Sequence, residues 1–101
     1  MRLADLAQQA ALATFGEPVT LVIDGNPLPV VGIFVAAHEA VEFAGDAAVS
    51  TVRPLLTVQA EALPTLPVEG DEAEIRGNRY VVADVRPDGF GMVKLFLQEA
   101  G

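Results

Sequence analysis

The stretch GDEAEIRGNRYVVADVRPDGFGMVKLFL, residues 70–97, decides the fold. Apolar and polar residues alternate on both sides of Gly77-Asn78, a two-residue connection whose members tolerate positive φ. A second turn follows at Pro87-Asp88-Gly89, and the residues from Val93 to Leu97 then alternate strictly, as in a strand with one buried face. Strands joined by tight turns predict an antiparallel meander that can close a small β-barrel.

The rest of the chain adds further strands and one helix to this meander. We expect strands over residues 19–24, 28–35, 55–60, 72–76 and 79–86, and an amphipathic helix over residues 3–15 that ends at Gly16. Pro29 cannot donate a hydrogen bond within a sheet, so it belongs at an edge or at the start of its strand. Gly32 indicates a bulge or a close backbone approach. The expected fold is mainly β: a small β-barrel or sandwich with a short N-terminal helix and one long loop.

Length and composition set the limits of this domain. With 101 residues, the chain fits one domain, with a helical segment over residues 1–16 and a barrel over residues 18–99 that includes a loop over residues 36–50. A net charge of -8 argues against a protein whose main task is to grip nucleic acid. There is no cysteine and no apolar run near the ~18 residues of a membrane span. Asp5 and Gln8 interrupt any signal peptide, so we expect the chain to be made in the cytoplasm.

No residue pattern predicts catalysis or a metal. His38 is the only histidine, and with one carboxylate at Glu42 it leaves a metal site short of ligands. Ser50 lacks the surroundings of a nucleophile, and Gly89-Phe90-Gly91 precedes a strand where a phosphate cradle would need a helix. We therefore expect no enzyme activity, no cofactor and no bound metal, and we interpret the many carboxylates as a solvated acidic face.

The segment over residues 36–50 is the first candidate site. It is rich in alanine, contains neither Lys nor Arg, and shows no clear periodicity. A long loop in a compact domain is usually functional. Its candidate channel-facing or partner-binding residues are His38, Glu39, Glu42, Phe43 and Asp46.

A group of charged residues in the C-terminal half is the second candidate. Arg76, Arg79 and Arg86 stand out in an acidic chain. They can pair with carboxylates of their own chain, such as Asp71 and Glu74 or the later Asp84. They can equally meet the acidic face of a neighbouring copy in a head-to-tail ring, and the sequence leaves both interpretations open.

From about Gly32 to Leu97 the chain resembles the head–tail joining proteins of long-tailed phages, the head-completion or stopper family that includes the lambda head–tail connector. The features that carry the resemblance occur in the family's order: Gly32-Ile33-Phe34, an acidic variable loop, Pro54-Leu55-Leu56-Thr57-Val58, Gly70-Asp71 with Ile75, Tyr80 with Val82 and Val85, Pro87-Asp88-Gly89, and Leu95-Phe96-Leu97. Val35 departs from the family, whose members often have an acidic residue there. The prolines of residues 63–68 stand where a helical turn is expected.

The resemblance implies a structural protein of the virion neck. Its copies would form a ring, typically a hexamer, beneath the portal and adaptor of the head. The ring would close the DNA exit channel and give the tail terminator or tail tube a docking surface. DNA would pass through without sequence-specific binding, no membrane would be involved, and assembly would occur in the host cytoplasm. The acidic loop would then become ordered on assembly.

Two other functions remain open at this point. A tail terminator or another phage connector also forms acidic β rings. A small cellular β-barrel adaptor would instead bind a protein or peptide along an edge strand near Pro29. Self-association separates the adaptor, which would be a monomer, from the ring proteins.

Overall fold

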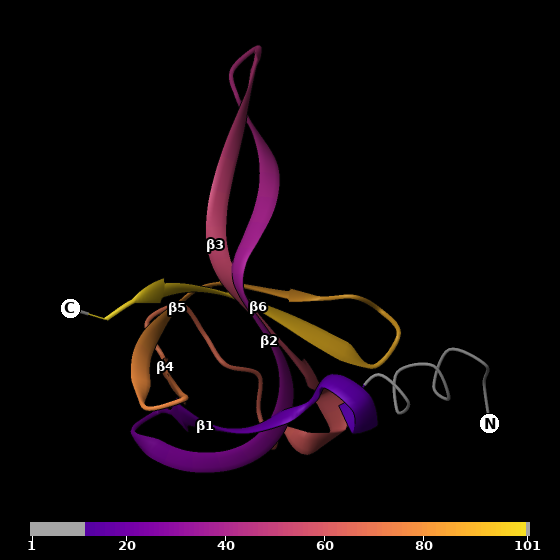
Figure 1. The fold of residues 1–101 in the computed structure, drawn as a ribbon, viewed down its shortest axis with the longest axis vertical. Coiled ribbons are helices and arrows are strands. Elements are labelled where there is room, and N and C mark those ends of the chain that lie inside the picture. The colour runs from indigo at the N-terminus through magenta and orange to yellow at the C-terminus, as the bar shows by residue number, and fades with distance from the viewer. Residues whose placement is uncertain (1–11, 101) are drawn as a thin grey trace.

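The computed structural model describes residues 12–100, which contain six strands, a 3-10 helix and one helical turn. The strands are β1 (Glu17–Ile23), β2 (Asn26–Ala44), β3 (Ala47–Gln59), β4 (Glu72–Ile75), β5 (Asn78–Pro87) and β6 (Met92–Glu99), and the 3-10 helix η1 is Ala60–Ala62. They form one closed antiparallel barrel in the order β1-β2-β3-β6-β5-β4, and a long hairpin rises from it (Figure 1). The mainly β barrel expected from the sequence is confirmed.

The core fills the inside of the barrel with every second residue of the strands. Val93, Leu95 and Leu97 of β6 are each 0% exposed, as the alternation predicts, and Leu21 and Leu56 from other strands are buried just as completely. Burying a side chain of this size stabilises the fold by about 1.5–3 kcal/mol. The core side chains therefore supply the main favourable term for closing the barrel.

A two-residue turn joins β4 to β5. Ile75 pairs with Asn78, so the β4–β5 turn consists of Arg76 and Gly77, with φ of 53° and 79°. The expected turn at Gly77-Asn78 is wrong by one residue, since Asn78 already belongs to β5. This turn type needs positive φ at both positions, and glycine at the second is the residue that adopts it without strain.

The described part of the expected N-terminal helix is one turn, residues 12–15. The remainder of the expected helix, residues 3–11, lies outside the described residues. The backbone N–H of Gly16 donates to the carbonyl of Leu12 at 2.9 Å and closes this turn. A Cβ on Gly16 would contact the carbonyl oxygen of Leu12 and come within 2.7 Å of Val31 Cγ1, so glycine permits close packing of the turn on β2.

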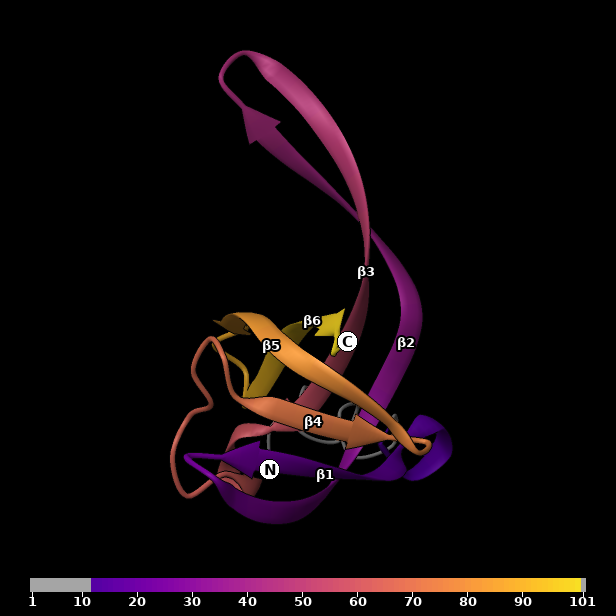
Figure 2. The same ribbon diagram turned by 90° about the vertical axis from the view of Figure 1, so that its left-hand side faces the viewer.

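The loop expected over residues 36–50 is wrong: these residues form a two-stranded hairpin. His38 pairs with Arg53, and the register continues without interruption to Ala44 and Ala47 beside the turn. The hairpin stands away from the barrel, so neither of its faces packs on the core (Figures 1 and 2). The inside–outside alternation that identifies a strand in sequence is therefore missing.

Gly32 makes the close approach that the sequence predicts. A Cβ at this position would lie 2.7 Å from Leu56 Cδ1 and 3.0 Å from Val58 Cγ1, closer than a core tolerates. Pro29 pairs with Thr20 of β1, and the pairing of β2 with β3 begins only at Gly32. Pro29 thus lies in the first part of its strand, where β3 requires no hydrogen bond from it.

Candidate functional site: the arm and its base

We call residues 36–54 the arm. Their described strand segments pair with each other and with no other strand of residues 12–100, since the β3–β6 pairing starts at Leu55 with Phe96. From His38 to the tip at Ala44 the arm extends about 20 Å, at ~3.3 Å per residue. Both outer edges of this ribbon expose backbone N–H and C=O groups that a partner strand could use.

A bulge marks the point where the arm leaves the barrel. Val35 pairs with Leu55, but the next register pair joins His38 to Arg53, so β2 carries one extra residue there. A bulge of this kind bends its strand and increases the local twist. The sequence predicts a bulge or a close approach at Gly32; Gly32 makes the close approach, and the bulge lies between Val35 and His38.

Beneath the bulge, an apolar contact lies on the outside of the barrel. Phe96 alternates with the inward Leu95 and Leu97, so its ring points away from the core, yet it is only 8% exposed. The His38 ring lies 6.0 Å from it, edge to face, and the Arg86 guanidinium stacks 4.8 Å above its centroid. Phe96 is thus covered by His38 of the arm and by Arg86 of β5. These contacts anchor the base of the arm on the barrel.

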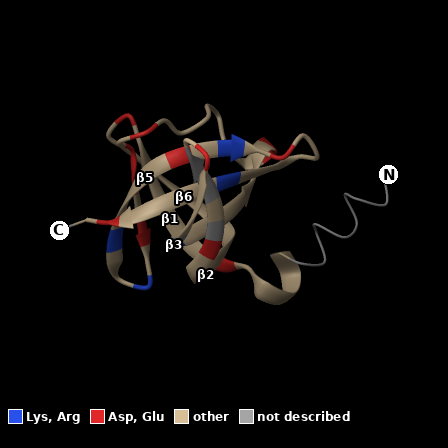
Figure 3. Ribbon diagram, turned by 90° about the horizontal axis from the view of Figure 1, so that it is seen from above, with Lys and Arg blue, Asp and Glu red and all other residues tan. Residues whose placement is uncertain are grey.

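Basic side chains surround this contact. Arg53 is the register partner of His38, Arg86 covers Phe96, and Lys94 pairs with Arg86 across β5 and β6. Neighbouring stretches of β5 and β6 beside the arm are accordingly blue in Figure 3. We call His38, Arg53, Arg86, Lys94 and Phe96 the base patch.

The candidate residues of the arm follow the hairpin's register. Glu39 pairs with Val52, and its carboxylate accepts a hydrogen bond from the Ser50 hydroxyl at 2.8 Å. Glu42 and Phe43 occupy register positions opposite Val49 and Ala48, near the tip. Asp46 lies in the turn and is exposed. His38 and the adjacent Glu39 lie at the base instead. The structure therefore divides the five candidates between the two ends of the arm.

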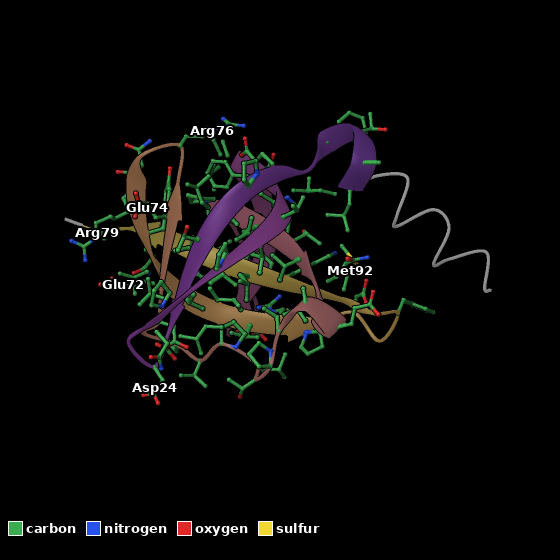
Figure 4. The ribbon with its side chains drawn as sticks, turned by 90° about the horizontal axis from the view of Figure 1, so that it is seen from below. Asp24, Glu72, Glu74, Arg76, Arg79 and Met92 are labelled. Atoms are coloured by element: carbon green, nitrogen blue, oxygen red, sulfur yellow. The ribbon has the colours of Figure 1, made fainter. Side chains whose placement is uncertain are left out.

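The three arginines form ion pairs within the chain, two of them at one end of the barrel. Arg76 contacts Glu17 at 3.0 Å, and Arg79 contacts Glu72 at 2.9 Å (Figure 4). Arg86 contacts Asp84 at 2.6 Å, seven residues further along β5 than Arg79, or about 23 Å. Their side chains are 58–65% exposed, so each pair contributes no more than about 1 kcal/mol. Their outer faces can still contact another molecule.

The two carboxylates expected beside these arginines differ in their surroundings. The Asp71 carboxylate accepts hydrogen bonds from the backbone N–H of Val68 at 2.9 Å and of Asp24 at 3.3 Å. It therefore ties the segment before β4 to the β1–β2 turn. Glu74 is exposed and is the register partner of Arg79, although Arg79 forms its ion pair with Glu72.

Within residues 12–100, no three His, Cys, Asp or Glu side chains come together as a metal site would require. No helix in that same range is long and apolar enough to cross a bilayer. The notable chemistry of the described structure is thus the charge and the exposed backbone of the arm and its base.

A comparison with protein families identifies the family of this chain. A family model described as Phage Head-Tail Attachment protein matches residues 1–97. The chain belongs to this family. The resemblance to phage head–tail joining proteins is thereby confirmed at the level of the family, whose members are structural proteins that act at the junction of head and tail.

Solved structures share the fold of this head–tail attachment protein. Among them is the crystal structure of the ATP-binding sugar transporter-like protein from Salmonella typhimurium, which is 22% identical in sequence. The match covers 95% of this chain and 85% of that chain, with a TM-score of 0.54. Identity this low shows a common fold and nothing about ligand or activity. No curated protein matches the chain.

Sequence reasoning missed three members of the base patch of this head–tail attachment protein: Arg53, Lys94 and Phe96. One clue was present, since Phe96 is an aromatic residue on the outward side of an alternating strand and so needs a cover. Arg53 and Lys94 are ordinary strand residues in the sequence. Only the pairing of β3 with β6 and of β6 with β5 brings them to one surface.

Proposed function

We propose that this protein is a neck component of the lambda-like kind, a ring of copies, typically six, between the portal or adaptor of the head and the tail terminator or tail tube. In this proposal the ring closes the DNA exit channel and gives the tail its docking surface. The match of the family model to residues 1–97 carries the proposal.

The shape and charge of the chain suit this role. The arm projects from the barrel and exposes backbone along both outer edges, which suits it to contacts between proteins. We propose the arm residues Glu39, Glu42, Phe43 and Asp46 as the part that faces the channel or a partner. With a net charge of -8, the ring would repel DNA phosphates, so DNA would pass without adhering.

The test is electron microscopy of a lysate in which the gene for this chain is disrupted. We expect DNA-filled or leaking heads and finished free tails, and we expect a plasmid copy of the intact gene to restore joined particles. Normal particles from the disrupted strain would contradict the proposal. Tails of irregular length in that lysate would instead favour a tail terminator.

A further inference from the structure

The arm tip and the base patch carry opposite charges. We call residues 42–46 the arm tip, and they contain Glu42 and Asp46 and neither Lys nor Arg. The base patch contains Arg53, Arg86 and Lys94, which are half of the six basic residues of the chain. Asp84 is the carboxylate that pairs with Arg86 there.

The basic residues of the base patch share one outward face. Leu55 pairs with Phe96, and Phe96 pairs with Asp84, in one row across β3, β6 and β5. Lys94 and Arg86 form the row two residues away, and Arg53 lies two residues beyond Leu55 on the other side. The three cations therefore extend over about 13 Å along the strands. A patch of this length is wide enough to accept a two-stranded ribbon, whose strands lie about 4.8 Å apart.

The tip cannot reach the base patch of its own chain. The two are separated by about 20 Å of paired hairpin, and the arm points away from the barrel in both views (Figures 1 and 2). At physiological salt this is more than two Debye lengths, so the charges scarcely interact within one chain. Their complementarity becomes effective only between two molecules.

We infer that the acidic arm tip of one copy docks on the base patch of the next copy. This inference rests on the proposed ring and names the contact that joins its subunits. Tip and base are different surfaces of the same chain, so the contact is head-to-tail, the type of interface that closes into a ring. The exposed Val41, Val49 and Val52, which are 62%, 43% and 65% exposed, add apolar area along the arm.

A second copy fits the base patch better than nucleic acid does. Three cations, one of them already paired with Asp84, give weak phosphate binding in a chain of net charge -8. The arm tip instead carries two acidic residues, Glu42 and Asp46, on a narrow ribbon with free backbone edges. Opposed charges on the two ends also set the orientation in which copies join.

Paired cysteines test this contact directly, because the chain has no cysteine of its own. The test variant combines Asp46→Cys at the tip with Lys94→Cys in the base patch. The matched control combines Asp46→Cys with Glu61→Cys, at an exposed residue of η1 outside both the arm and the base patch. Both variants and the intact chain are supplied to the disrupted strain, and the resulting particles are exposed to dissolved oxygen and run on a non-reducing gel.

We expect a ladder that extends beyond the dimer for the test pair and no ladder beyond the dimer for the control pair. A disulfide needs Cα atoms within about 7 Å, so tip and base of one chain cannot join each other. Joined particles without a ladder, or equal ladders from both variants, would overturn the arm contact. Failure of the intact chain to restore joined particles would instead overturn the proposed function, so the two failures are distinguishable.

Charge reversal gives a second test that does not depend on cysteine chemistry. We expect Asp46→Lys alone and Lys94→Glu alone each to lower the fraction of heads joined to tails by at least about tenfold. The double variant should recover to within about threefold of the intact chain, because it restores an opposite pair. Glu61→Lys, a charge reversal at an exposed residue of η1, should leave joining unchanged. Single reversals without effect, or a double variant as poor as the worse single, would contradict the inference.

Discussion

At the scale of single residues, Phe96 shows how this small barrel buries apolar area on both sides of one strand. The inward Leu95 and Leu97 fill the core, while Phe96 is covered from outside by the Arg86 guanidinium and the His38 ring. Arg86 therefore acts as apolar cover as well as a charge. The base of the arm is consequently held by packing rather than by its hydrogen-bonded register alone.

Removal of this ring should cost far more than removal of an exposed one. We expect Phe96→Ala to lower the free energy of unfolding by about 3 kcal/mol, near the lower end for a buried aromatic because its site opens to solvent. Phe90, which is 64% exposed, is the matched control, and Phe90→Ala should change stability by less than about 0.5 kcal/mol. Urea unfolding followed by circular dichroism measures both. Equal losses in the two variants would show that Phe96 has no packing role.

Gly32 offers a second test at this scale, now inside the barrel. Gly32→Ala places a Cβ 2.7 Å from Leu56 Cδ1, so we expect a loss of about 1–3 kcal/mol from overpacking. Val52→Ala, an alanine substitution on the exposed arm of the same sheet, should cost less than about 0.5 kcal/mol. The same urea titration compares them, and a neutral Gly32→Ala would mean that the sheet yields easily at this point.

At the scale of elements, the arm is long but contributes none of the buried side chains of the described core. We expect deletion of residues 41–46 to leave the barrel folded, since residues 47–50 can then serve as a four-residue loop between the paired Ala40 and Thr51. The melting temperature should stay within about 4 °C of the intact chain. The deletion should abolish the joining of heads to tails.

A length-matched variant separates the arm's shape from its charge. Glu42→Gln combined with Asp46→Asn keeps the full length of the hairpin and removes two carboxylates. We expect it to join particles more weakly than the intact chain but better than the deletion, as counted by infectious titre. If the deletion still yields infectious particles, the arm is not needed for assembly.

The arm also marks the boundary of what the sequence could predict. Alternation identified β1, β4, β5 and β6 and the inward residues of the last strand, because one face of each meets the core. The arm has solvent on both faces, so no burial pattern exists in its sequence, and alanine favours no particular element. The turn between β4 and β5 was misplaced by one residue in the sequence prediction, because Arg76 adopts positive φ, which a residue with a long side chain seldom does.

The candidate site was predictable only in part for the same reason. Local sequence drew attention to the acidic stretch that became the arm tip. The base patch joins residues from β2, β3, β5 and β6 that are up to 58 positions apart in sequence, from His38 to Phe96. Only the pairing of these strands determines which of the residues become neighbours. The ion pair of Arg76 with Glu17 depends in the same way on the pairing of β1 with β4.

At the scale of the whole molecule, the barrel closes through the β1–β4 pairing, a short seam with three register pairs. Ala73 lies in this seam and is 1% exposed. We expect the Ala73→Glu variant to be unfolded and to show no cooperative thermal transition. A carboxylate would be buried without a partner in a small domain of modest stability. Glu74→Ala, next to it and facing solvent, should retain a normal thermal transition in calorimetry. A folded Ala73→Glu variant would show that the barrel can open at the seam without unfolding.

The free edges of the arm have a consequence for copies that have not yet joined a particle. An exposed two-stranded ribbon is a template on which identical ribbons can stack into fibrils. Glu39, Glu42 and Asp46 bring like charges together whenever two arms align side by side, so they act as gatekeepers against that stacking. The carboxylates at the arm tip would thus keep a pool of free subunits soluble until a ring begins to form.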